Sequence, residues 1–105
     1  MFLARWTVCA KFGHKDETVA LCKRWQQEVG DRVGMKQGQS RVAVSAIGPV
    51  ESRFEFESQF SSLAELEKAW AEMAKIPAHK KFSKELEEHV VSGSNGWEIL
   101  RVLDL

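Results

Sequence analysis

The chain is poor in the features that mark metal, nucleic-acid and membrane proteins. Its 105 residues include two cysteines, Cys9 and Cys22, whose spacing fits neither a zinc knuckle nor a CxxC pair. No apolar run approaches the ~20 residues that a membrane-spanning helix needs. Fifteen Lys and Arg balance fifteen Asp and Glu, so the basic field of a nucleic-acid-binding protein is missing. We therefore expect neither a nucleic-acid partner nor a membrane.

Catalytic motifs of fixed spacing are missing as well. Gly34-x-x-x-Gly38 continues with Gln39 instead of a Lys-Ser pair, so it is not a phosphate-binding loop. Neither GxSxG nor HExxH occurs. The three histidines show no metal-ligand spacing, because His14 falls in a predicted loop and His79 and His89 stand ten residues apart on one predicted helix. We expect no metal and no cofactor.

The start of the chain shows no targeting segment. Arg5 interrupts the short apolar stretch of residues 1–4 too early for the core of a signal peptide. We therefore expect a cytoplasmic protein whose two cysteines are small buried hydrophobes in a reducing compartment. Whether the two cysteines touch is left open by the sequence.

Alternating apolar and polar residues predict four strands, and a period of three to four residues predicts the helices between them. The first helix runs from an N-cap at Asp16 to Val29 and is ended by Gly30 as a left-handed residue. Residues 31–40 show no clear period. The predicted strands are residues 2–12, 41–47, 53–60 and 97–103.

A second helical region follows the third strand and carries the clearest signals. Ser62 and Glu65 form a capping box, and Pro77 either ends the first helix or opens the next one. The first helix presents one apolar face, made of Leu63, Leu66, Trp70 and Met73. The second presents a stripe of the same period, made of His79, Phe82, Leu86, His89 and Val90.

The order of elements predicts a single α+β domain over residues 1–105, with a ferredoxin-like βαββαβ fold, a four-stranded antiparallel sheet and a second helix broken near Pro77. Such a sheet has its helices on one face. Residues 41–47 are apolar on both faces, which predicts an interior strand. Because several strands carry apolar residues on both sides, we expect the reverse face to be apolar and to form a homodimer, sheet against sheet.

The segment from Phe60 to Trp70, continuing through Pro77-Ala78-His79 and Phe82, resembles the dimeric α/β-barrel superfamily, and within it the NIPSNAP and antibiotic-biosynthesis-monooxygenase types. The preceding Gly48-Pro49 hairpin is similar to the NIPSNAP pattern. The resemblance implies a barrel closed by two subunits and a small organic molecule held between sheet and helices. One subset degrades haem with an Asn on the first strand, but this chain has only Asn95, so that activity is not carried over.

His79 is the first candidate for chemistry, because its stripe is otherwise apolar and its imidazole titrates near neutral pH. It is either a general base or haem ligand at the mouth of a cavity, or a helix-start histidine bonded to backbone or water. The four tryptophans either line a pocket for a flat ligand or fill the core and the dimer interface, namely Trp6, Trp25, Trp70 and Trp97. Of these, Trp6 and Trp70 are candidates for ligand binding, together with Phe82. Arg101 either pairs with a glutamate across the strands or holds the carboxylate or phenolate of a ligand.

Three functions are consistent with this pattern. The first is a domain that binds a small apolar or aromatic molecule between sheet and helices. The second is a cofactor-independent monooxygenase acting on an aromatic substrate, with His79 as catalytic residue. The third is a structural or regulatory dimer with a filled core. An open cavity near His79, Trp70 and Arg101 would separate the first two from the third.

Overall fold

A computed structural model describes residues 1–36, 38–48 and 52–105 of the chain. The predicted order of elements is confirmed, with a short 3-10 helix, η1, added after the first helix. The expected turn at Gly48-Pro49 includes Pro49, which lies outside the described residues. The elements are β1 (Phe2–Cys9), α1 (Lys15–Glu28), η1 (Gly30–Arg32), β2 (Ser40–Val44), β3 (Arg53–Phe60), α2 (Leu63–Ala74), α3 (Pro77–Leu86) and β4 (Gly96–Arg101).

The four strands form one antiparallel sheet in the order β2-β3-β1-β4, which is the ferredoxin-like arrangement. The expectation of an interior second strand was wrong, because β2 lies at the edge of the sheet. Its Val42 and Val44 stay 47% and 40% exposed. One face of β2 carries Val42 and Val44 and the other carries Arg41 and Ala43, and no strand of the described residues pairs with its outer side.

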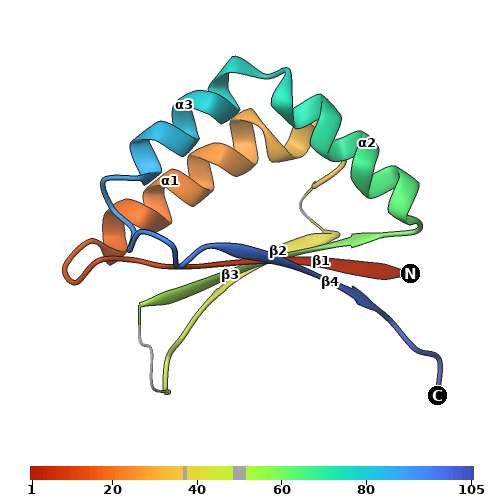
Figure 1. The fold of residues 1–105 in the computed structure, drawn as a ribbon, viewed down its shortest axis with the longest axis horizontal. Coiled ribbons are helices and arrows are strands. Elements are labelled where there is room, and N and C mark those ends of the chain that lie inside the picture. Colours follow the sequence, from red (N-terminus) through yellow and green to blue (C-terminus); the bar gives the residue numbers. More distant parts are fainter. Residues whose placement is uncertain (37, 49–51) are drawn as a thin grey trace.

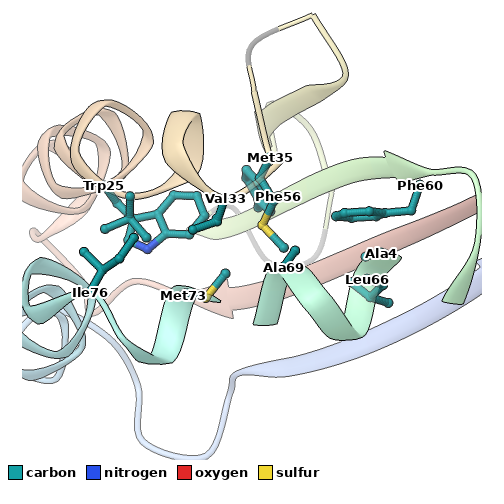
Figure 2. Packing of buried hydrophobic residues seen from close by; sticks show 11 residues of the cluster. Ala4, Trp25, Val33, Met35, Phe56, Phe60, Leu66, Ala69, Met73 and Ile76 are labelled. Atoms are coloured by element: carbon teal, nitrogen blue, oxygen red, sulfur yellow. The ribbon is translucent and has the colours of Figure 1, made fainter. Parts of the chain in front are cut away.

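All three α-helices lie on the same side of the sheet, and the opposite side is uncovered in a single chain (Figure 1). The core fills the space between the two layers. Trp25 of α1 and Ile76 lie at one end of it, and Phe60 and Leu66 lie at the other (Figure 2). Each of these four side chains is buried, which explains the alternation in β3 and the periodicity of α1 and α2.

Helix α1 differs from its prediction at both ends. It begins after His14 instead of after Asp16. At its other end Gly30 is not in the left-handed conformation but opens η1. A Cβ atom on Gly30 would stand 2.9 Å from the Trp25 ring and 2.8 Å from Nε2 of Gln26. Glycine is therefore needed here for close packing, not for a left-handed turn.

Helix α2 begins as predicted, because the Ser62 side chain accepts a hydrogen bond from the Glu65 amide at 3.2 Å. The reciprocal half of the capping box is replaced, since the Glu65 carboxylate accepts from the Ser61 hydroxyl at 2.7 Å. The buried face is also turned relative to the prediction. Ala69 is buried, whereas Leu63 is 49% exposed.

Pro77 occupies the first turn of α3, which confirms the second of the two predicted roles. The helix ends at Leu86, so the predicted stripe is too long. His89 lies beyond the helix, and Val90 forms an isolated bridge with Ala10 at the end of β1. This bridge ties the segment after α3 to the sheet.

The reverse face of the sheet is not the apolar surface that the sequence suggested. Arg5 lies 3.0 Å from Glu55, and Arg41 lies 3.1 Å from Glu57. Arg53 approaches Glu55 at 3.7 Å, so that charges of both signs run across three strands. The prediction failed because the glutamates of β3 alternate with buried phenylalanines and must therefore face the reverse side.

Candidate functional site

A cavity of about 410 Å³ lies between the helical layer and the sheet. Its volume falls within the range typical of small-molecule sites. Residues of α1 and α3, of all four strands and of the segment that joins α3 to β4 contribute to it. The cavity is lined by Trp6, Val8, Cys22, Trp25, Val42, Phe56, His79, Phe82, Ser83, Leu86, Glu87, Val90, Asn95 and Trp97.

One row of side chains crosses the whole sheet and forms the floor of the cavity. Trp6 of β1 stands directly opposite Phe56 of β3 on one side and opposite Trp97 of β4 on the other. Phe56 in turn faces Val42 of β2. Residues that face each other in an antiparallel pair project from the same side of the sheet. The register thus brings three aromatic rings and one valine into a continuous apolar surface.

The helices supply the roof of the cavity. Trp25 of α1 packs edge-on against Phe56, with 5.3 Å between ring centroids. Phe82 of α3 lies 6.1 Å from the Trp25 ring, and His79 lies one turn earlier on the same helix. The roof and floor are therefore both aromatic, which suits a flat ligand.

His79 is held by a hydrogen bond from Trp25, whose indole Nε1 donates to Nδ1 at 3.0 Å. A ring nitrogen that accepts carries no proton, so the neutral imidazole has its proton on Nε2. Burial lowers the pKa of His79 from its ordinary value of 6.5, which also favours the neutral form. In this tautomer neither nitrogen has a free lone pair. Action as a general base or as a haem ligand would require the bond to Trp25 to break first.

The described lining of the cavity contains few charged side chains, and its net charge is negative. Glu87 is the only carboxylate among the described lining residues, and no Lys or Arg is among them. The Ser83 hydroxyl is engaged, because it donates to the backbone carbonyl of His79 at 3.1 Å. Burial raises the pKa of the Cys22 thiol to about 11, so this group is protonated at neutral pH. Cys22 and Cys9 are both free, so they form no disulfide.

Three of the five residues singled out from the sequence line the cavity, namely His79, Phe82 and Trp6. Trp70 does not line it but packs edge-on against Trp97, with 5.4 Å between ring centroids, and thus supports its wall. The buried Nε1 of Trp70 has no hydrogen-bond partner among the described residues.

Arg101 lies away from the cavity. It stands opposite Phe2 in the β1–β4 pair, at the other end of β4 from Trp97, and its guanidinium lies 5.3 Å from the centre of the Phe2 ring. Of its two predicted roles, pairing with a glutamate of β3 (Glu55 or Glu57) is contradicted, because those glutamates face the reverse side, where they meet Arg5. Arg101 is not among the residues that line this cavity.

Two histidines meet outside the cavity, where the sequence suggested no contact. Nδ1 of His14, just before α1, lies 3.0 Å from Nδ1 of His89 in the turn after α3. The predicted single helix through both His79 and His89 was wrong, because α3 ends at Leu86. Among the described residues no three His, Cys, Asp or Glu side chains gather in a way that could hold a metal ion.

Within residues 1–36, 38–48 and 52–105, no helix combines the length and the apolar character that crossing a bilayer requires. No protein-family model and no curated protein sequence matches the chain. Likeness is found among solved structures instead, at low sequence identity.

A NIPSNAP family protein from Agrobacterium tumefaciens superimposes with a TM-score of 0.81 at 17% identity, covering 98% of this chain and 93% of that one. A second NIPSNAP family protein of the same organism, of unknown function, gives 0.78 at 19% identity, with 95% and 86% covered. An antibiotic-biosynthesis-monooxygenase-like protein from Deinococcus radiodurans gives 0.71 at 13% identity, with 100% and 95% covered. These structures match the resemblance expected from the sequence, and the chain has the ferredoxin-like α+β fold of NIPSNAP and antibiotic-biosynthesis-monooxygenase-like proteins.

Proposed function

We propose that this protein binds a small, largely apolar molecule with a flat ring system in the cavity between the sheet and the helices α1 and α3. The observation that carries the proposal is the row of Val42, Phe56, Trp6 and Trp97 across the sheet, which faces Trp25 and Phe82 above it. A filled core, as in a purely structural module, would leave no cavity of about 410 Å³ between the sheet and the helices. A mainly apolar pocket with a few polar groups is the usual form of a ligand site.

The test is the binding of 1-aminoanthracene, a flat neutral fluorophore whose emission rises in apolar surroundings. Val42→Trp adds bulk to a residue that lines the cavity and should weaken binding at least tenfold. Val44→Trp is the matched control, because Val44 lies on the same face of β2 with similar exposure but does not line this cavity. Failure of the wild-type protein to bind, or equal binding by both variants, would overturn the proposal.

We also propose a homodimer formed through the reverse face of the sheet. Leu3 and Leu100 face each other across β1 and β4 on that side and form an apolar strip. Only 8% of Glu57 is exposed in a single chain, so this carboxylate is largely shielded from water before any partner covers it.

A cytoplasmic location remains a prediction from the sequence.

Oxidation of an aromatic substrate is the second candidate function. The likeness to the Deinococcus radiodurans structure favours it, as does a histidine beside an aromatic cavity. Oxygen uptake with a panel of hydroquinones tests this candidate. Uptake that is absent, or unchanged in His79→Ala, removes the enzymatic alternative and leaves the binding proposal in place.

A further inference from the structure

We propose that His79 serves the cavity as a fixed hydrogen-bond donor, and that the site therefore selects uncharged flat ring systems bearing a carbonyl oxygen. This inference rests on the proposed binding function and names the class of ligand. It depends on three observations, which are the bond between Trp25 and His79, the charge of the lining and the state of the other polar groups.

The bond to Trp25 determines which proton His79 can offer. An indole N–H can only donate, so the Nδ1 atom it reaches at 3.0 Å must be the acceptor. The proton of the neutral ring is then on Nε2, the nitrogen farther from the backbone. No hydrogen bond engages Nε2 within the described residues, and His79 is one of the residues that line the cavity. We therefore assign this N–H to a ligand in the cavity. A ligand that satisfies it must present an acceptor.

The charge of the lining favours neutral acceptors over anionic ones. Glu87 is exposed, so water weakens the effect of its negative charge, but no cationic side chain of the described lining is present to attract an anion. A carboxylate or phenolate in this apolar site would lose its hydration and face a like charge. A carbonyl oxygen accepts the same hydrogen bond without either cost.

Three of the other polar groups are poorly suited to this role. The Ser83 hydroxyl already donates to the His79 carbonyl at 3.1 Å. The Cys22 thiol is a weak donor. Asn95 is exposed, so water competes for its amide. Trp6 and Trp97 also carry indole N–H donors, and His79 is the donor whose ring orientation is held by a hydrogen bond from Trp25. We assign the discrimination between ligands of equal shape to His79.

The experiment compares 9-fluorenone with fluorene, which have the same ring skeleton and differ by a carbonyl group in place of a methylene group. Binding is followed by quenching of tryptophan fluorescence, since Trp6, Trp25 and Trp97 line the cavity. One hydrogen bond from a neutral donor corresponds to a preference for fluorenone of roughly three- to tenfold. His79→Phe keeps an aromatic ring without a donor and should abolish the preference for fluorenone over fluorene.

Two controls separate this inference from the proposed function. His89→Phe removes a histidine outside the cavity and should keep the preference. If both compounds bind wild type equally, the donor role is overturned and the cavity remains a binding site. If neither compound binds, the proposed function fails together with this inference.

Trp25 acts as a positioning residue, and its effect on the tautomer of His79 can be measured without any ligand. Long-range ¹H–¹⁵N correlation spectra of the histidine rings should show Nδ1 of His79 unprotonated and Nε2 protonated in the wild-type protein. Trp25→Phe removes the N–H and should mix the two tautomers while reducing the fluorenone preference. Protonated Nδ1 in the wild-type protein would overturn the assignment of the donor.

Discussion

The indole of Trp25 and the imidazole of His79 are 54 residues apart in the sequence and joined by a 3.0 Å hydrogen bond between Nε1 and Nδ1. The bond spans the helices α1 and α3 above the cavity. It engages the only accepting nitrogen of the neutral imidazole, Nδ1, and leaves the N–H of Nε2 on the opposite side of the ring. The same contact thus ties the two helices together and defines what His79 can offer to a ligand.

The stability of the protein should fall below neutral pH because of His79. Burial lowers the pKa of the folded histidine below 6.5, so between that lowered value and 6.5 the unfolded chain binds more protons than the folded one. The contribution of neutral His79 to the free energy of unfolding is therefore complete above about pH 6.5, and it is lost as the pH falls from 6.5 through the lowered pKa. Urea unfolding followed by tryptophan fluorescence from pH 8 to pH 5 measures it.

His79→Gln is the control for this titration, because its amide oxygen can still accept from Trp25 and does not titrate in this range. The free energy of unfolding of the wild type minus that of His79→Gln should be constant above about pH 7 and shrink toward pH 5. A difference that stays flat, or that grows as the pH falls, contradicts the effect of burial on His79.

Gly30→Ala should destabilise the protein by about 1–3 kcal/mol, the usual cost of overpacking a filled site. The new Cβ would stand 2.9 Å from the rigid Trp25 ring and 2.8 Å from Gln26 Nε2. Gln26 cannot easily withdraw, because its Nε2 donates to the Met35 carbonyl at 2.6 Å. Thermal unfolding measures the loss.

Gly96→Ala is the matched control for this substitution. Gly96 begins β4, has no positive φ, and no atom lies within 4 Å of the site of a new Cβ. Its free energy of unfolding should change by less than about 0.5 kcal/mol. Equal losses in the two variants would show that contact with Trp25 is not what Gly30 provides.

The fold was readable because its signals are local. The alternation of Phe54, Phe56 and Phe60 defines β3, and Ser62 and Pro77 mark the starts of α2 and α3. The position of β2 was not readable, since apolar residues on both faces do not distinguish an interior strand from an edge strand. Pairing between strands decides that question, and pairing is not a property of one segment.

The cavity could not be predicted from the sequence either, because it also depends on pairing between strands. Alternation assigns Trp6 and Trp97 to faces of their strands, but only the register shows that they stand opposite each other. Nothing near Trp25 in the sequence points to its contact with His79. Arg101 shares a strand face with Trp97 but lies at the other end of β4. Trp97 lines the cavity and Arg101 does not, and the sequence of the strand alone does not show this difference.

Leu100→Asp should dissociate the proposed homodimer. The substitution places a charge in the strip that Leu3 and Leu100 form on the reverse face, and burying an unpaired carboxylate against a second chain is unfavourable. Sedimentation at micromolar concentration should show a dimer for the wild type and a monomer for the variant. Leu105→Asp, at a fully exposed position, should remain dimeric. A wild-type protein that sediments as a monomer contradicts the proposal.

Cys22 should react slowly with alkylating reagents and more slowly still when the cavity is occupied. Burial raises its pKa to about 11, and the thiolate is the reactive form. In a Cys9→Ser background at pH 8, alkylation by iodoacetamide should be at least about tenfold slower than that of a small free thiol. The rate should recover in urea, where the thiol is no longer buried. Since Cys22 lines the cavity, 1-aminoanthracene should slow alkylation of the folded protein further, and an unchanged rate at saturating fluorophore would place that ligand elsewhere.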